Sequence, residues 1–532
     1  MAQIKQFHFG RGQLEELKDY VSDDGKRYGL NWPVVYLLSN PQQSKNKVAY
    51  VGETHKALNR AREHLTDPQK SDLKILHVIT DFDYNQSVCK DLESHLIRWL
   101  AGSGHELLNR NDGLSNLDYH QAENYRLSFK VIWQNLKTNQ IVDQNIEDIE
   151  NNILFKYSPY KALTETQQNI ANDLLASFAQ DSEMSKTCVI SGEPGTGKTI
   201  LATYLVKRFK QKYPRLTIAL VIPMQQLRYS LKMVFKSDVD LKPDMAISPY
   251  DVAKKTYDIL IVDEAHRLKR RVNLSQYSHF DTINRRFNFG HDGSQLDWIL
   301  HQSRSQILLY DEQQSIQPGD IRPQALSNLN IDEYYLNDQI RIRAGKNYIN
   351  YIDDILNNRR PIKRSFTSYE FRLFNSLAEM IQLIKEHDKR VGLSRIVAGY
   401  SWKWLTKKNP NLEYDFIIDN IPLKWNSSSV LDWPNSENAI NEVGCIHTIQ
   451  GYDLNYAGVI IGQDLIYDPI SKILKINPDN YHDFNGKRTA SSSELEQYIK
   501  NIYKVLLTRA MRGTYIYVVD PHLRQYLADY FF

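Results

Sequence analysis

Two short stretches of the chain carry residue types that bind and activate phosphates. The first, SGEPGTGKT at Ser191–Thr199, fits the pattern G-x-x-x-x-G-K-[ST] and lies between the apolar run CVI and the apolar segment ILATYLV. Its glycines allow backbone N–H groups to converge on phosphates at a helix N-terminus. Lys198 can reach the β- and γ-phosphates, and Thr199 can hold Mg²⁺. We expect nucleotide contacts from Gly192, Glu193, Pro194, Gly195, Thr196, Gly197, Lys198 and Thr199.

The second stretch, DILIVDEAH at Asp258–His266, ends an apolar strand in two carboxylates. Asp263 suits the Mg²⁺ shell, and Glu264 can activate the attacking water. The two stretches occur in order along the chain, and each is expected to lie on a strand of its own. The sequence therefore predicts a chain that binds ATP with Mg²⁺ and hydrolyses it.

Length and composition describe a soluble globular protein. The 532 residues suggest roughly three domains. No apolar run is long enough to span a bilayer, and the N-terminal MAQIKQFHFGRGQ lacks the apolar core of a signal peptide. The three scattered cysteines fit a reducing compartment and argue against a Cys-based metal site. We expect a cytoplasmic protein with no membrane partner; the net charge of +3 neither demonstrates nor excludes nucleic-acid binding.

Apolar runs along the chain predict an α/β protein. A short helix near 13–21 precedes a small α/β unit at 33–110, with strands VVYLL, VAYVGE and ILHVIT. Strands CVI, TIALVIP, ILIVDE and ILLYDE follow, and after residue 335 come RIVAGYS, GCIHTI, AGVIIG and TYIYVVD. Strands that alternate with helices predict doubly wound parallel sheets. We expect a domain at 1–115, a helical linker at 116–160, two further domains at 161–334 and 335–532, and a polar excursion at 464–498.

The remaining motifs stand in an order that resembles superfamily 1 helicases, and specifically the Schlafen group 3-like helicase family, over about residues 160–532. The resemblance implies two RecA-like domains with ATP between them. Within LTETQ, Gln167 resembles the glutamine that reads adenine. In ILLYDEQQSI, Gln314 resembles the glutamine that senses the γ-phosphate. In NDQIRIR, expected after a short helix, Arg341 resembles the arginine that reaches the γ-phosphate from the second domain.

Two late motifs complete the resemblance. CIHTIQGYDLNYAGVIIG implies that His447 and Thr448 approach nucleic acid. The same motif implies that the nucleotide cleft is approached by Gln450, Gly451 and Asp453. VLLTRAMRG supplies Arg509 as the arginine finger, with Arg512 nearby, to stabilise charge on the transferred phosphoryl group.

Domain closure and reopening on hydrolysis can move such a motor along a strand. The interval between the phosphate-binding loop and the DEAH stretch is too short for a large inserted subdomain, which favours translocation over unwinding. Trp402 and Trp404 follow the strand RIVAGYS. They could stack on bases, or pack in the core or between domains, and the sequence leaves both interpretations open.

The N-terminal unit resembles a GIY-YIG nuclease over roughly residues 33–112. VVYLL carries Tyr36, and AYVGET carries Tyr50, although the first glycine of the family pattern is missing. Arg60 and His64 are four residues apart and share a helix face. The family's metal-binding glutamate corresponds to Glu93 in DLESHLIRWL, and its late asparagine to Asn109, with Asn111 as the alternative.

The resemblance implies a hydrolytic site for phosphodiesters. Glu93 would hold a divalent cation, Mg²⁺ or alternatively Mn²⁺, that polarises the phosphate. Tyr50, assisted by Tyr36 or His64, would act as the base for water. Arg60 would stabilise the developing charge.

Together these features predict an ATP-dependent nucleic-acid translocase or helicase coupled to a metal-dependent endonuclease, acting on DNA in preference to RNA. By analogy of architecture, the pairing suits bacterial anti-phage defence. A nucleotide-controlled switch that binds nucleic acid or protein without translocating is the alternative, as is an N-terminal domain that binds DNA without cutting it. The sequence identifies neither an oligomer nor a partner protein of a defence system.

Overall fold

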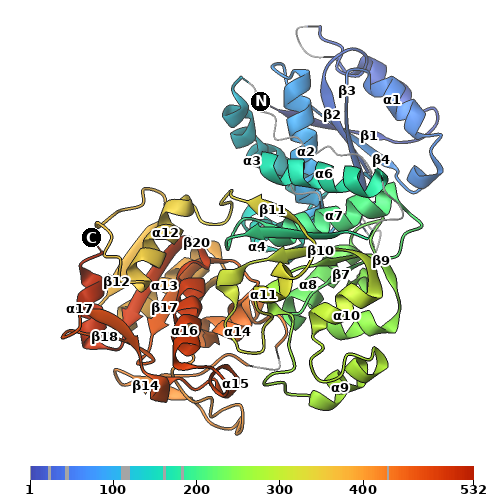
Figure 1. The fold of residues 1–532 in the computed structure, drawn as a ribbon. Helices are drawn as coiled ribbons and strands as arrows, with labels where there is room; N and C mark the ends of the chain where they lie inside the picture. The colour runs from blue at the N-terminus through green and yellow to red at the C-terminus, as the bar shows by residue number, and fades with distance from the viewer. Residues whose placement is uncertain are drawn as a thin grey trace. The chain divides into compact units, whose positions relative to one another are not determined.

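The computed structural model describes residues 2–21, 25–41, 47–109, 120–159, 163–180, 185–427 and 430–531. It divides into two compact units, one made of Met1–Thr164 with Leu231–Met245 and the other of Glu165–Ser230 with Ala246–Phe532 (Figure 1). The domain boundaries expected at 115/116 and 160/161, and the alternative residue Asn111, lie outside the described residues. Among the helices that are described, none combines the length and apolar character needed to cross a membrane.

The first unit is built on a five-stranded sheet. Its strand order is β1 (Gln3–His8), β4 (Ile75–Thr80), β2 (Val34–Ser39), β3 (Val48–Thr54) and β5 (Glu106–Leu107). The pairs β1·β4, β2·β4 and β2·β3 are antiparallel, and β3·β5 is parallel. Side chains alternate between the two faces of a strand, and β2 is buried on both, with Val35 in one apolar cluster and Val34 in another. Burial on both faces explains the continuous apolar run VVYLL.

Helices cover this sheet on both sides. The helix α1 (Ala57–His64) packs in the cluster that contains Val34, and α2 (Gln86–Gly102) in the cluster that contains Val35. The expected helix near 13–21 is a 3₁₀ helix at Leu14–Asp19. Strand β1 was not predicted, because as an edge strand it buries only Phe7 and its other residues, apart from Ile4, are polar.

The segment 116–160 differs from the expected linker. Its described part forms α3 (Ala122–Thr138), α4 (Ile146–Asn151) and α5 (Ile153–Lys156). Trp133 and Leu136 of α3 are buried in the same apolar cluster as Leu100 of α2. A narrow apolar stripe on a polar helix is enough to bury one face, so the segment belongs to the core of the first unit.

The second unit contains two parallel sheets. The first has the order β11 (Asp332–Leu336), β6 (Thr187–Gly192), β10 (Ser303–Tyr310), β9 (Tyr257–Val262), β7 (Ile218–Val221) and β8 (Ala246–Ile247), with every pair parallel. The accompanying helices are α6 (Glu165–Gln180), α7 (Lys198–Lys212), the first part of α8 (Gln225–Lys236), which continues into the first unit from Leu231, and α9 (Tyr277–Arg286), α10 (Gln295–Gln302) and α11 (Gln324–Ser327). Strand β10 lies between β6 and β9, so the carboxyl ends of these three strands meet at one edge.

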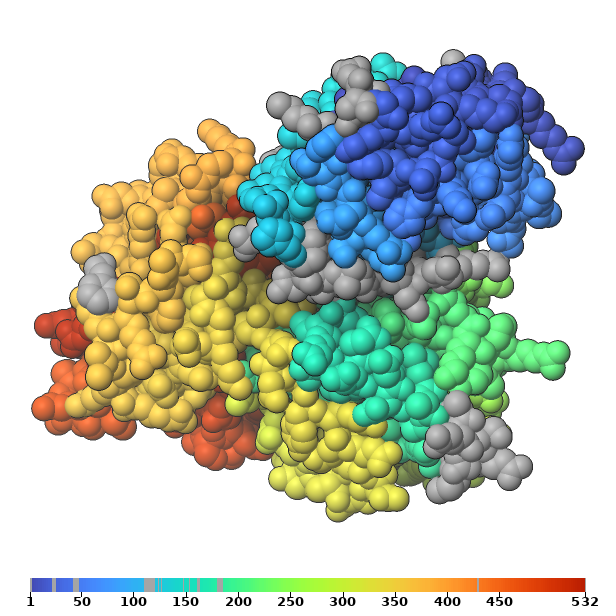
Figure 2. Space-filling view, turned by 90° about the horizontal axis from the view of Figure 1, so that it is seen from above, coloured from blue at the N-terminus to red at the C-terminus, as the bar shows by residue number. Residues whose placement is uncertain are grey.

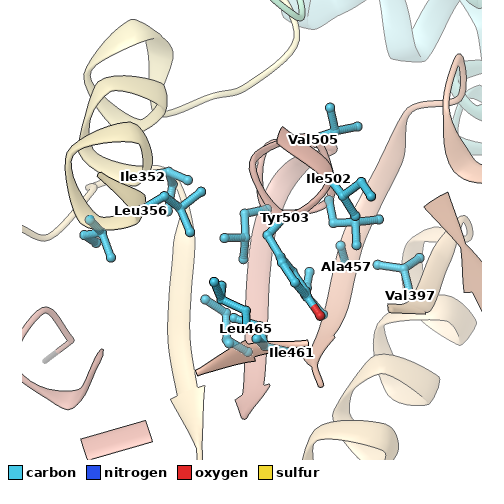
Figure 3. Packing of buried hydrophobic residues seen from close by; sticks show 14 of the residues in the cluster. Ile352, Leu356, Val397, Ala457, Ile461, Leu465, Ile502, Tyr503 and Val505 are labelled. Carbon is cyan, nitrogen blue, oxygen red and sulfur yellow. The ribbon is translucent and has the colours of Figure 1, made fainter. Parts of the chain in front are cut away.

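The other sheet has the order β12 (Glu370–Phe374), β20 (Ala510–Val518), β17 (Leu454–Ile461), β13 (Ser394–Ala398) and β16 (Val443–Cys445), again parallel throughout. Its helices are α12 (Gly345–Leu356), α13 (Leu377–Val391), α14 (Ile446–Ile449), α15 (Phe484–Lys487), α16 (Ser492–Leu507) and α17 (Pro521–Ala528). Figure 3 shows Ile502 and Tyr503 of α16 among Ala457 and Ile461 of β17. Each sheet with its helices forms one lobe of the second unit, coloured teal to yellow and gold to red in Figure 2.

Two expectations in the second lobe need correction. GCIHTI is a strand only as far as Cys445, and IHTI forms the one-turn helix α14. The segment 464–498, expected as a polar excursion, contains an antiparallel hairpin of β18 (Leu465–Asp468) and β19 (Ile473–Ile476). Leu465 and Leu474 are buried in the main apolar cluster. Apolar residues at alternating positions of the hairpin therefore attach it to the lobe. A small hairpin of β14 (Phe416–Ile418) and β15 (Ile421–Leu423) completes the sheets.

Candidate functional sites

The phosphate-binding loop connects β6 to α7. Gly195 and Gly197 have φ angles of +87° and +78°, a left-handed conformation that favours glycine. Lys198 Nζ donates to the carbonyl oxygens of Gly192 at 2.6 Å and Glu193 at 3.1 Å. The same amine lies 3.2 Å from Asp311 Oδ2 at the end of β10. Lys198 is thereby held across the loop, as a phosphate-binding lysine requires.

The two carboxylates after β9 point to different partners. Asp263 is fully buried and accepts a 2.7 Å hydrogen bond from Thr199 Oγ1. Burial, with the neighbouring charge of Glu264, raises the pKa of Asp263 above its ordinary value. Glu264 has a φ angle of +50°, and its Oε2 lies 3.0 Å from His266 Nε2. Burial acts to raise the pKa of Glu264, but His266 and the nearby cations hold it below its ordinary value.

This division of partners fits the expected cation. A buried carboxylate and a hydroxyl are the hard oxygen ligands that Mg²⁺ prefers, and Asp263 and Thr199 provide one of each. Glu264 contacts His266, whereas Asp263 contacts Thr199. The predicted roles, cation binding by Asp263 and water activation by Glu264, remain predictions.

The two predicted glutamines both reach the loop region. Gln167 is buried, and its Nε2 donates to the carbonyl of Thr196 at 2.8 Å. Gln314 Nε2 donates to Asp311 Oδ2 at 2.7 Å, the same oxygen that pairs with Lys198. Gln314 is thus connected to Lys198 through the Asp311 carboxylate that both contact.

The second lobe contributes a further set of polar contacts. Arg341 Nε lies 2.5 Å from Asp453 Oδ1, which joins two predicted residues. Gln450 accepts a hydrogen bond from Arg267, a residue absent from the sequence predictions although it directly follows the DEAH stretch. Gly451 has a φ of +87°, and a Cβ there would lie 2.9 Å from the methyl group of Met224. This motif is therefore fitted closely against the first lobe.

Gln339 connects the loop to the arginine segment and was not predicted. Its Nε2 donates to the carbonyl of Pro194 at 2.7 Å, and its Oε1 accepts from the backbone N–H of Arg341 at 3.0 Å. The signal in the sequence was its place two residues before Arg341. The segment that carries Gln339 and Arg341 follows strand β11, not a short helix as expected. Because β11 pairs with β6, this pairing places the segment beside the phosphate-binding loop that follows β6.

We expect Gln339→Ala to lower kcat/KM for ATP hydrolysis about threefold to tenfold, the effect of about one hydrogen bond. The loop and the Arg341 segment would lose their shared contact, while Lys198 and Asp263 would stay in place. Steady-state phosphate release measures this, with the exposed Gln324→Ala as the matched control. Equal kinetics for both variants would contradict a coupling role.

Arg509 lies at the junction of α16 and β20. Its side chain is buried, and its carbonyl accepts from the N–H of Leu454 at the start of β17. Asp453 immediately precedes that strand. The amino ends of β20 and β17 are adjacent, so Arg509 lies near the Arg341–Asp453 pair. Arg512 follows, half-buried, on β20.

Two polar cavities lie where the lobes of the second unit approach each other. One, of about 270 Å³, is lined among others by Tyr400, Trp404, Lys407, Asn426, His447 and Thr448. The other, of about 510 Å³, is lined among others by Arg228, Arg267 and Lys269. Gln317 and Asn485 line both, so the cavities adjoin.

The two tryptophans, Trp402 and Trp404, differ in one respect, which is contact with the smaller cavity. Both are half-buried and pack against the same apolar cluster, in which Trp402 stacks on Phe416 with ring centroids 4.6 Å apart. Trp404 lines the smaller cavity, with Lys407 Nζ 5.3 Å from its ring. His447 also lines that cavity and lies 2.8 Å from Asp483 Oδ2. Both tryptophans therefore pack against the apolar cluster, and only Trp404 also lines the smaller cavity, beside Lys407.

The first unit has a cavity of its own, of about 450 Å³. It is lined by the predicted residues Tyr36, Tyr50, Arg60, Glu93 and Asn109, together with Gly52, Glu53, Asp67, Gln69, Lys70 and Leu108. Tyr36 pairs with Gly52 in the β2·β3 register, and a Cβ on Gly52 would lie 2.2 Å from Tyr36 Oη. A glycine is therefore needed for the phenol of Tyr36 to lie over β3.

Three carboxylates line this cavity: Asp67 pairs with Lys70, and Glu53 and Glu93 lie close enough to influence each other's charge. Burial, reinforced by the charge of Glu53, raises the pKa of Glu93 to about 7. Glu53 was not predicted, although it directly follows Gly52 on β3. Oxygen donors from two neighbouring carboxylates fit a divalent cation. Within the described part of the chain, no cluster of three or more His, Cys, Asp or Glu side chains is placed to hold a metal ion, so a cation here would depend on these two.

Two predicted catalytic residues have other roles. The amide of Asn109 is used by the backbone of Val51, accepting from its N–H at 3.0 Å and donating to its carbonyl at 2.7 Å. His64 is buried and does not line the cavity. Both of its ring nitrogens are engaged, by Tyr36 Oη at 2.8 Å and Lys70 Nζ at 2.7 Å. Asn109 therefore positions β3, and His64 is not placed to take a proton from water.

Comparison with known proteins identifies relatives of this chain. An uncharacterized protein of Saccharomyces cerevisiae is 28% identical over 406 residues, which are 66% of this chain and 86% of that protein. Among solved structures, the Pif1 helicase from Candida albicans aligns with a TM-score of 0.29 and 10% identity over 68% of this chain and 96% of its own. Bacteroides Pif1 bound to ssDNA aligns with a TM-score of 0.28 and 13% identity over 68% and 93%. Scores at this level add no weight to the fold described above.

The family comparison agrees with the motifs. The model of the Schlafen group 3, DNA/RNA helicase domain matches residues 185–520. The match contains the phosphate-binding loop, the DEAH stretch and both late motifs. Because it spans well over half of the sequence, the chain belongs to the Schlafen group 3 DNA/RNA helicase domain family.

Proposed function

We propose that this chain is an ATP-driven translocase on single-stranded nucleic acid, coupled to a metal-dependent phosphodiesterase in its first unit. One observation carries the motor part: Lys198, Asp263 and the Arg341–Asp453 pair belong to one connected set of contacts in the second unit. Gln339 bonds to both the loop and the arginine segment, which makes the set continuous. Two lobes that each supply part of a phosphate cage are suited to a closing motion.

The residues divide the work of hydrolysis. Loop N–H groups and Lys198 bind the β- and γ-phosphates, and Thr199 and Asp263 would hold Mg²⁺, which neutralises phosphate charge when bound. Glu264, kept ionised beside His266, orients and deprotonates the attacking water. Arg341 can exchange Asp453 for the γ-phosphate, so nucleotide binding would break one ion pair and form another. That exchange is how the second lobe would sense the nucleotide.

The adjoining cavities are the proposed path of the nucleic acid. Trp404 offers a ring for base stacking, while Lys407 and Lys269 offer cations for phosphates. His447 and Thr448 line the smaller cavity together with Trp404 and Lys407, which supports the proposal that they contact nucleic acid. Binding through such groups should weaken steeply with salt.

The cavity of the first unit is proposed to cleave a phosphodiester. Glu93, with Glu53, would hold the cation that polarises the phosphate. Tyr50 lines the cavity as the base for water, and Arg60 is placed to stabilise the developing charge. DNA is the proposed substrate, and a role in anti-phage defence is proposed from the pairing of the two activities.

The decisive experiment incubates the full chain with labelled single-stranded, duplex and forked DNA and RNA, with Mg²⁺, in the presence and absence of ATP. We expect single strands to stimulate ATP hydrolysis and DNA to be cut in a metal-dependent reaction. ATP hydrolysis that no strand stimulates would favour a nucleotide-controlled switch instead. Tight DNA binding without cleavage would make the first unit a binding module.

Glu93→Gln should reduce metal-dependent nicking of supercoiled plasmid on the order of 100-fold or more, because the neutral amide binds the cation poorly. ATP hydrolysis should remain within about twofold, since the phosphate-binding loop lies in the other unit. Plasmid nicking and phosphate release are measured on the same preparation, with the exposed Glu16→Gln as control. Undiminished nicking by Glu93→Gln would assign the cleavage to another source.

A further inference from the structure

Lys70 is a buried lysine beside the cavity of the first unit. It ends a short 3₁₀ helix, Pro68–Lys70, and its side chain is 9% exposed. Its Nζ lies 3.2 Å from Asp67 Oδ2 and 3.9 Å from the centroid of the Tyr50 ring. Lysines are seldom buried without compensation, and here a carboxylate and an aromatic face provide it. Burial lowers the pKa of the Lys70 amine, and the Asp67 carboxylate opposes this shift and favours the ammonium form.

The ammonium determines the protonation of His64. A lysine ammonium has three donors and no acceptor, so the 2.7 Å contact between Lys70 Nζ and His64 Nδ1 requires Nδ1 to accept. Burial and the charge of Lys70 lower the pKa of His64 to about 4, so the ring is neutral at pH 7. A neutral imidazole that accepts at Nδ1 carries its proton on Nε2.

The tautomer in turn sets the direction of the next hydrogen bond. His64 Nε2 lies 2.8 Å from Tyr36 Oη, so the Nε2–H donates and the phenol oxygen accepts. Because the phenol oxygen accepts from His64, the hydroxyl proton of Tyr36 is not donated to His64. Tyr36 lines the cavity, so this proton is available on the cavity side. In the opposite tautomer, with the proton on Nδ1, the Tyr36 hydroxyl would donate its proton to His64 Nε2.

We propose that Lys70 is a positioning residue of this cavity: it holds His64 in the Nε2–H form and so directs the hydroxyl proton of Tyr36 toward a phosphodiester oxygen. The catalytic consequence rests on the proposed phosphodiesterase function, whereas the tautomer of His64 does not. Neither the resemblance to a nuclease nor any sequence motif assigns a role to Lys70.

The tautomer is measured directly on the wild-type chain. The protein is labelled with ¹⁵N-histidine, and the His64 signals are identified by their loss in His64→Gln. At pH 7.5 we expect Nδ1 of His64 to have the shift of an unprotonated nitrogen and Nε2 that of a protonated one. A proton on Nδ1, alone or together with Nε2, would overturn the proposal, whether or not the chain cleaves DNA.

The consequence is tested by a double-mutant cycle on nicking. Lys70→Met should lower the rate about 10-fold to 100-fold, within the range of a lost general acid, and should populate the Nδ1–H form of His64. Lys74→Met, an exposed lysine whose amine donates to the Ser71 carbonyl, is the matched control and should change neither.

In the Tyr36→Phe background, Lys70→Met should cause no further loss, because both changes remove the same proton. Multiplied defects would show that Lys70 acts independently of Tyr36 and would overturn the proposal. Absence of nicking by the wild-type chain would instead reject the phosphodiesterase function and leave the tautomer result standing.

Discussion

Lys198→Ala should reduce ATP hydrolysis below about 1% of the wild-type rate, because it removes the charge that contacts the β- and γ-phosphates. In the structure this amine is already placed over the loop, held by the carbonyls of Gly192 and Glu193 and by Asp311. No other amine shares these contacts in the described part of the loop. The expected loss is therefore in the chemical step as well as in binding.

Phosphate release with and without single-stranded DNA provides the measurement. Lys210→Ala, on the same helix with its amine bonded to the Pro214 carbonyl, is the control and should be near normal. Lys198→Ala leaves Asp311 buried without its cation, so we expect a lower Tm, moderated by the hydrogen bond from Gln314. Near-normal turnover by a folded Lys198→Ala variant would remove the assignment of this loop.

The loop was predictable because its requirements are local. Positive φ angles at Gly195 and Gly197 demand glycine, and the lysine and hydroxyl must follow at fixed offsets. Asp263 was predictable for the same reason, as it directly follows a buried strand whose apolar run is visible in the sequence. Short-range geometry of this kind is encoded in spacing.

Contacts between distant segments were not predictable in this way. Gln339 and Pro194 are 145 residues apart, and nothing in the local pattern of either indicates the other. Lys70 resembles any surface lysine in the sequence, and only the fold shows that its amine meets His64 and the Tyr50 ring. Glu53 was missed because its neighbour Glu93 comes from a different element.

The two corrected residues of the first unit illustrate the same limit. Asn109 and His64 have the residue types that a hydrolytic site uses, and the sequence supports no finer statement. In the structure the Asn109 amide hydrogen-bonds to the backbone of Val51, and the His64 ring hydrogen-bonds to Tyr36 and Lys70. Since a buried polar group that is already paired gains little by moving, we expect these side chains to hold the site in place.

Arg509→Ala should leave ATP binding largely intact and lower turnover on the order of 10³-fold, as expected for an arginine finger. Arg509 is buried at the amino end of β20, near Asp453, which precedes β17 and pairs with Arg341. Lys198 and the loop amides, which are proposed to bind the ground-state phosphates, belong to the first lobe. The contribution of Arg509 should therefore appear when the transferred phosphoryl group develops charge.

Single-turnover hydrolysis and a fluorescent-nucleotide titration separate the two quantities for Arg509→Ala. Arg509→Lys should recover only a small part of the rate, because an ammonium lacks the planar fork of donors. Arg359→Ala, an exposed arginine that pairs with Asp353 and Asp354, is the control. If affinity for ATP collapses while turnover of the bound nucleotide survives, Arg509 is a ground-state contact. The charge on the transferred phosphoryl group must then be met by Arg341, once released from Asp453, or by Arg512 on β20.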